Sequence, residues 1–173
     1  MHPQVMSQMV DRYNEFQAAI PLIEELGMQV AIENHTDTFS QEILWIVDKL
    51  NHSLIGTCVD TMNCLYITEN PYDTMERMLP KAYCCHFSDD IVVTDPLGVH
   101  IIGAPHGQGS MDCPKMVAQI REKSPMDKII FENEIAFKSV DEPIEEARAR
   151  EMAACEESIR YLREELKLGL RGR

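Results

Sequence analysis

Four side chains that can bind divalent cations stand at the ends of short apolar runs. Glu33 closes the run Val-Ala-Ile, Asp60 follows Thr-Cys-Val, His86 follows Tyr-Cys-Cys and Glu132 follows Ile-Ile-Phe. They are 27, 26 and 46 residues apart, and one strand–helix–strand unit takes about 30 residues. Because parallel strands share one carboxyl edge, we expect these four side chains to converge there.

Three carboxylates and one imidazole make an oxygen-rich ligand set. Such a set suits Mn²⁺, Mg²⁺ or Co²⁺ better than a structural Zn²⁺, which prefers thiolates. Each residue alone has a simpler interpretation: an exposed or helix-capping Glu33 or Glu132, a turn-forming Asp60, and His86 as a core histidine. Because all four residues stand at the same position, directly after an apolar run, the sequence favours a shared metal site.

The spacing of apolar residues predicts the elements that position these side chains. Strands are expected over 28–34, 54–60, 81–87 and 126–134, and helices over 5–20, 21–27, 40–51, 70–80, 113–123 and 143–167, with Ser40 and Asn70 as N-caps. The alternation predicts one α/β domain over 1–173 with about four parallel strands and flanking helices. Residues 88–112 hold four Gly and two Pro without a sustained period, which predicts a long loop.

The composition excludes several classes of partner. The formal net charge is −13, which argues against nucleic acid and anionic membranes, because both bind basic faces. No apolar run reaches the length of a membrane span, and the N-terminal residues lack the pattern of a secretory signal. The six cysteines follow no metal-binding spacing. We therefore expect a cytoplasmic protein with reduced thiols.

Five short motifs resemble those of the xylose isomerase-like TIM barrel superfamily of sugar phosphate isomerases and epimerases. The motifs are VAIENH, CVDTMN, CCHFSDD, HGQGSMDCPKMV and IIFENE, and they follow the family's order across about residues 15–140. The superfamily includes tagatose- and psicose-type 3-epimerases, hydroxypyruvate isomerase, inosose dehydratase and endonuclease IV. The resemblance implies a partial (β/α)8 barrel that contains strands five to eight with their helices.

The resemblance also assigns roles at the four strand ends. It implies Glu33, Asp60, His86 and Glu132 as ligands of a divalent cation, with Glu33 and Glu132 transferring a proton through an enediolate of a small carbohydrate or keto-acid. Glu134 would share a face with Glu132 if the strand continued, so the last ligand has two candidates. Asp89 or Asp90 would accept a hydrogen bond from the ring of His86.

Three further residues are candidates for contact with the substrate. His35 follows the first motif, and its alternative is an exposed loop histidine. Asn63 stands where many sugar epimerases of the family have His, which weakens the prediction of a ketohexose substrate. His106 begins HGQG, whose glycines would let the backbone approach a ligand; the alternative is a flexible turn.

Length separates the chain from its family, because complete barrels average about 250 residues. The resemblance therefore implies the C-terminal half of a barrel, whose open edge strands invite pairing with a second copy or with a missing N-terminal half. A catalytically inactive metal-binding remnant or interaction module is the alternative to an enzyme of carbohydrate metabolism. An endonuclease IV-like phosphodiesterase is disfavoured by the acidic charge and the shortage of further histidines.

Overall fold

The computed structural model describes residues 3–169 and divides the chain into two compact units. The first comprises the residues up to His86 together with Lys123–Ile130, and the second comprises Phe87–Glu122 and the residues from Phe131 onward. The sequence predicted a single domain without a linker, and the chain passes between these units at residues 86–87, 122–123 and 130–131.

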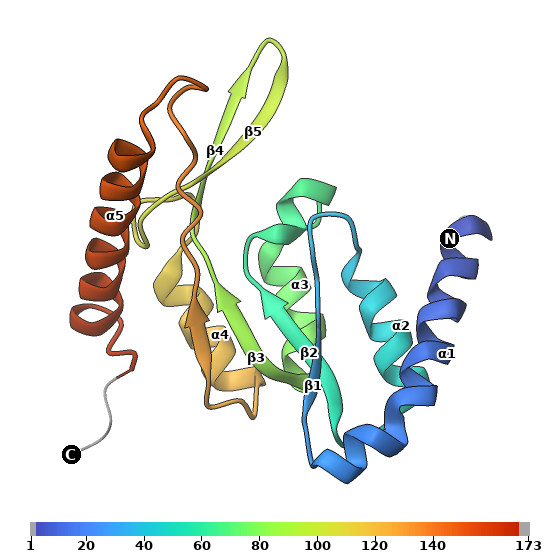
Figure 1. The fold of residues 1–173 in the computed structure, drawn as a ribbon. Helices are drawn as coiled ribbons and strands as arrows, with labels where there is room; N and C mark the ends of the chain where they lie inside the picture. The colour runs from blue at the N-terminus through green and yellow to red at the C-terminus, as the bar shows by residue number, and fades with distance from the viewer. Residues whose placement is uncertain (1–2, 170–173) are drawn as a thin grey trace. The chain divides into compact units, whose positions relative to one another are not determined.

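A four-stranded sheet lies at the centre of the first unit, in the order β1-β2-β3-β6 (Figure 1). β1 pairs with β2, and β2 with β3, in parallel, which confirms the predicted α/β sheet. The strands are β1 (Val30–Glu33), β2 (Ile55–Asp60), β3 (Ala82–Phe87) and β6 (Ile129–Phe131). β6 is shorter than predicted, so Glu132 and Glu134 lie beyond the strand.

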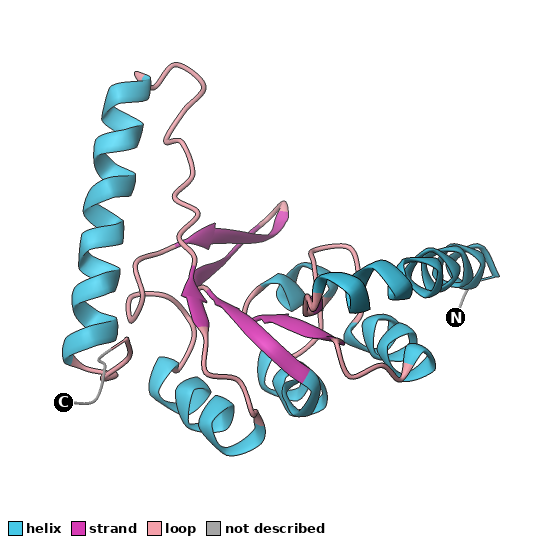
Figure 2. Ribbon diagram, turned by 60° about the horizontal axis from the view of Figure 1, so that its bottom comes forward, coloured by secondary structure: helices cyan, strands magenta, loops and turns pink. Residues whose placement is uncertain are grey.

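Helices of the first unit pack on the sheet and on one another. α2 (Ser40–Leu50) and α3 (Pro71–Met78) contact the strands, and α1 (Pro3–Leu26) packs along α2 (Figures 1 and 2). Two short 3₁₀ helices, η1 (Asn63–Ile67) and η2 (Leu79–Lys81), flank α3. Asn70 caps α3 with Pro71 at its first position, as predicted.

Two helix details differ from the predictions. α1 runs unbroken through Pro21, although proline removes one backbone donor from a helix interior. Ser40 is the first residue of α2 rather than its N-cap, which is Phe39. Glu42 accepts a hydrogen bond from the Phe39 N–H, while the Ser40 hydroxyl donates to the distant Glu69 at 2.8 Å. This long-range partner draws Ser40 away from the capping role.

The second unit contains an antiparallel hairpin where a loop was predicted. β4 (Asp90–Asp95) pairs with β5 (Gly98–Gly103) across a two-residue turn. Gly98 has φ of 145°, a conformation that requires glycine. α4 (Cys113–Lys123) and α5 (Ile144–Glu164) agree closely with the two predicted helices. The hairpin was missed because apolar residues occupy both of its faces, which hides the two-residue period.

Candidate metal centre

Three of the four predicted ligands converge within the first unit. Glu33 ends β1, Asp60 ends β2 and His86 is the penultimate residue of β3. Each offers one ligand atom, and these atoms lie within 4.8 Å of one another. Parallel strands end at a common edge, so three separate segments bring their side chains to one place.

Strand pairing fixes the positions of these side chains along the strand direction. Asp60 and His86 are direct partners in the β2–β3 ladder, and the N–H of Thr61 donates to the carbonyl of His86 at 3.1 Å. Glu33 is paired with Cys58, two residues before Asp60. Since alternate residues share a face, Cys58 and Asp60 belong to the same face of β2.

Hydrogen bonds hold the carboxylate of Glu33 in place. Its Oε1 lies 3.1 Å from Nδ1 of His86 and 3.3 Å from Nδ2 of Asn63, which donates to it. Glu33 and His86 are about one-third and one-quarter exposed, so both remain accessible to a ligand. The structure therefore brings Asn63 to the cluster, and its contact with a substrate stays a prediction.

Asp60 is the buried member of the cluster, with 2 % of its surface exposed. Its Oδ1 accepts hydrogen bonds from the N–H groups of Met62 at 2.8 Å and Asn63 at 2.7 Å. The turn-forming role that the sequence left open is thus real. It coexists with a place in the cluster, because one oxygen organises the turn while the carboxylate lies beside Glu33 and His86.

Asn34 supports the cluster and was not predicted as a functional residue. Its Nδ2 donates to the Asp60 carbonyl at 3.0 Å, and its Oδ1 accepts from the Asp60 N–H at 2.9 Å. The side chain is almost wholly buried. Asn34 therefore ties the end of β1 to the end of β2, and an asparagine directly after a strand-end carboxylate was the only sequence signal for this role.

The donor set fits a divalent cation. Two carboxylates and one imidazole provide hard oxygen donors and a nitrogen, as Mg²⁺, Mn²⁺ and Co²⁺ accept. Cys58 forms a second close group with Glu33 and His86, which adds a soft donor. The residues therefore suit a metal ion. Which metal binds most tightly depends on whether the ion takes the carboxylate oxygens or the sulfur of Cys58.

Glu132 and Glu134 belong to the second unit, directly after β6. The backbone N–H of Glu132 donates to the carbonyl of Phe87 at 2.9 Å, which anchors it beside the residue that follows His86. The charge of Glu134 helps to raise the pKa of Asp90. Because the strand stops at Phe131, the alternation that made Glu134 the second candidate is lost, and Glu132, which directly follows Phe131, stays the predicted fourth ligand.

Asp89 organises the glycine-rich loop of its own unit. Its carboxylate accepts hydrogen bonds from the N–H groups of Gly107 and Gly109, both at 2.9 Å, and of Met111 at 3.2 Å. A Cβ on Gly109 would collide with this carboxylate. The expectation that Asp89 or Asp90 accepts a hydrogen bond from the ring of His86 stays a prediction.

The two other predicted substrate contacts are placed differently. His35 is exposed, and its Nδ1 lies 3.2 Å from the Thr36 hydroxyl and 3.9 Å from the Asp37 carboxylate, which fits the alternative of an exposed loop histidine. His106 is 1 % exposed, with Nε2 2.6 Å from the Phe87 carbonyl. Burial lowers the pKa of His106, so it is a neutral core histidine.

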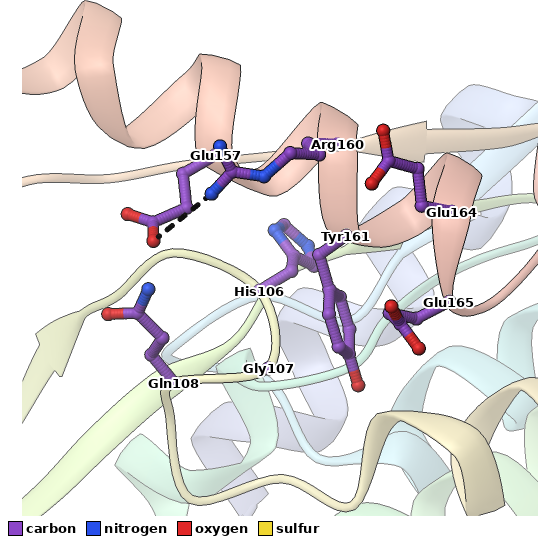
Figure 3. A pocket seen from close by; sticks show the side chains of 8 residues that line it. All are labelled: His106, Gly107, Gln108, Glu157, Arg160, Tyr161, Glu164 and Glu165. Carbon is purple, nitrogen blue, oxygen red and sulfur yellow. Dashed lines mark ion pairs between the residues drawn. The ribbon is translucent and has the colours of Figure 1, made fainter.

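His106 also borders a pocket that is formed entirely by the second unit. α5 contributes Glu157, Arg160 and Tyr161 to one side, and the loop contributes Gly107 and Gln108 to the other (Figure 3). Arg160 lies 3.7 Å from Glu157. The pocket measures about 180 Å³, and its positive charge is already paired, so we assign it no ligand.

Comparison with known proteins identifies the fold. The sequence model of the xylose isomerase-like TIM barrel matches residues 7–165. The uncharacterized protein YihM of Escherichia coli is 27 % identical over 88 residues, which are 51 % of this chain and 27 % of that protein. The matched segment therefore spans only about a quarter of this curated relative's length.

Solved structures with the same fold include metal-containing proteins and an epimerase. A xylose isomerase-like protein from Mycobacterium smegmatis in complex with magnesium aligns with a TM-score of 0.58 and 15 % identity, over 91 % of this chain and 53 % of that one. The IOLI protein with a bound zinc atom aligns with a TM-score of 0.65 and 15 % identity, over 88 % of this chain and 54 % of that one. An L-ribulose 3-epimerase aligns with a TM-score of 0.59 and 13 % identity, over 94 % of this chain and 59 % of that one. None of the helices among residues 3–169 has the length and apolar character needed to cross a bilayer.

Proposed function

The chain belongs to the xylose isomerase-like TIM barrel family, and on this premise we propose that it is a metal-dependent isomerase or epimerase of a small carbohydrate or keto-acid. The observation that carries the proposal is the convergence of Glu33, Asp60 and His86 from three consecutive strand ends. The epimerase among the proteins of like fold supports the same class.

Glu33, Asp60 and His86 would hold the divalent cation, and we assign Glu132 as the fourth ligand. The anchoring of the Glu132 backbone to Phe87 supports this assignment, because it fixes the start of the segment that carries the carboxylate. When bound, a divalent cation supplies Lewis-acid polarisation of a substrate carbonyl.

Glu33 and Glu132 are the residues to which we assign proton transfer. A carboxylate with an accessible oxygen can act as the base at the carbon next to a carbonyl, and Glu33 is partly exposed and oriented by Asn63. One carboxylate would remove the proton from the carbon that bears the hydroxyl group and give an enediolate. Return of a proton to the other face of the same carbon inverts the centre, whereas its return to the neighbouring carbon, with the hydroxyl proton passing to the former carbonyl oxygen, moves the carbonyl. The substrate class is thus a carbonyl compound with an adjacent hydroxyl group.

Exchange of solvent deuterium tests this function directly. Protein loaded with Mn²⁺ is incubated in D₂O with a panel of ketoses and hydroxylated keto-acids, and deuterium in the recovered compound is measured by mass spectrometry. We expect incorporation next to the carbonyl with the wild type and its loss in Glu33→Gln. Metal binding without exchange in any compound would favour the alternative of a metal-binding module, and absence of metal binding would reject the site itself.

A further inference from the structure

Cys58 lies close to two members of the cluster and is absent from the ligand set proposed above. The sulfur of Cys58, a Glu33 oxygen and a His86 nitrogen lie within 4.8 Å of one another. Cys58 is the ladder partner of Glu33 and is 4 % exposed. All three residues belong to the first unit, so this group requires no residue from elsewhere.

We propose that Cys58, with Glu33 and His86, forms a ligand set for a thiophilic divalent cation, with Zn²⁺ as the expected ion. The inference rests on the proposed function, because both ligand sets share Glu33 and His86. Hard cations take oxygen donors, whereas Zn²⁺ accepts sulfur, nitrogen and oxygen in tetrahedral sites. Asp60 and Cys58 are then alternative third donors, and the identity of the ion selects between them.

The sulfur donor binds in its deprotonated form. On binding, the Cys58 S–H bond breaks, its electron pair forms the bond to Zn²⁺ and the proton passes to solvent. No oxidant or reductant takes part. One carboxylate, one thiolate and a neutral imidazole leave one tetrahedral position, which a water molecule or a substrate oxygen can occupy.

Position in the sheet distinguishes Cys58 from the neighbouring thiols. Cys84 is the ladder partner of Cys58, yet among the described residues it joins no group of close metal-binding atoms. Cys64 is equally buried, but its sulfur lies near the Thr61 carbonyl at 3.9 Å. Cys64 is thus a matched control: a buried thiol of the same unit outside the group.

Cobalt substitution tests the inference on the whole chain. Co²⁺ gives visible d–d bands wherever it binds and an additional near-ultraviolet charge-transfer band when a thiolate is a ligand. We expect both in the wild type and in Cys64→Ser. Cys58→Ser should lose the charge-transfer band and keep the d–d bands, and its Zn²⁺ affinity should fall by about tenfold or more.

The outcomes separate this inference from the function on which it rests. Visible bands without a charge-transfer band, together with no sulfur shell in the X-ray absorption of the Zn²⁺-loaded wild type, overturn the role of Cys58 and leave the oxygen-rich site intact. Absence of both bands overturns both proposals. If Cys58→Ser fails to fold, X-ray absorption of the Zn²⁺-loaded wild type decides: a sulfur shell at about 2.3 Å supports the inference, and a shell of only oxygen and nitrogen rejects it.

Discussion

Nδ1 of His86 lies 3.1 Å from Oε1 of Glu33, although 53 residues separate the two in sequence. The pair joins the ends of β1 and β3 across the intervening β2, where Asp60 is buried. Removing either member should therefore damage the whole cluster rather than one contact.

Thermal unfolding with Mn²⁺ measures the contribution of this pair. At about a hundred times the dissociation constant, a ligand of the native state adds about 2.7 kcal/mol, which corresponds to a rise in Tm of about 5–10 °C for a chain of this size. We expect that rise in the wild type and its loss in both Glu33→Gln and His86→Ala.

The control for this measurement is His35→Ala. His35 is exposed, and its ring lies beside Thr36 and Asp37 of the same loop, so its variant should show the full Mn²⁺-dependent rise. An unchanged rise in Glu33→Gln and His86→Ala would refute the metal site, and loss of the rise in His35→Ala would restore that residue as a ligand contact.

Asp89 should be among the residues most sensitive to truncation. Its buried carboxylate accepts from three backbone N–H groups, and each buried donor left without a partner costs about 1–3 kcal/mol. Asp89→Ala should therefore lower the free energy of unfolding by about 3 kcal/mol or more, measured by urea denaturation.

The exposed residue Asp37 supplies the comparison. Asp37→Ala removes two exposed contacts, with the Thr38 hydroxyl and with the ring of His35, and should change stability by less than about 0.5 kcal/mol. A loss of Mn²⁺ binding in Asp89→Ala without a loss of stability would instead support the original expectation that Asp89 serves His86.

Asp90 should make stability depend on pH in the direction opposite to most carboxylates. Burial, followed by the charges of Asp89 and Glu134, raises the pKa of Asp90 from about 3.8 to about 6. Between these values the native state holds a proton that the unfolded chain has released, so stability falls as pH rises through this window and then stays constant.

The variant Asp90→Asn isolates this effect. Its stability relative to the wild type should increase from near zero at pH 4 to about 1–2 kcal/mol above pH 6, allowing for solvent screening. Asp11→Asn, at an exposed position on α1, should show no such trend. A constant difference between Asp90→Asn and the wild type across this range would mean that Asp90 titrates normally.

Local signals in the sequence predicted most of the first unit. Asn70 and Pro71 marked the start of α3 because capping acts within one turn, and the apolar runs before Glu33, Asp60 and His86 marked three strands. The shared edge of parallel strands then sufficed to place those three side chains together.

Long-range contacts account for what the sequence did not predict. Serine is a common N-cap residue, but the hydroxyl of Ser40 donates to Glu69, which lies 29 residues away in sequence. The sequence did not predict that the fold brings the N–H groups of Gly107 and Gly109 to Asp89. His106 resembles a ligand contact in sequence, and only packing against Phe87 reveals a core residue.

Asn34 should control metal affinity without being a ligand. Its side chain makes two hydrogen bonds to the backbone of Asp60, and loss of the partners that orient ligands lowers metal affinity by about 10–100-fold. Asn34→Ala should therefore weaken Mn²⁺ binding by this factor, measured by calorimetry well below the Tm, and also lower stability by about 2–3 kcal/mol.

The exposed Asn14 on α1 is the matched control, since Asn14→Ala removes the same group from a solvated helix face. Its Mn²⁺ affinity should equal that of the wild type. If Asn34→Ala lost stability but bound Mn²⁺ as tightly as Asn14→Ala, the hydrogen bonds to Asp60 would hold the strands together without orienting the carboxylate. The 10–100-fold change therefore distinguishes a residue that positions the metal ligand from one that only stabilises the sheet.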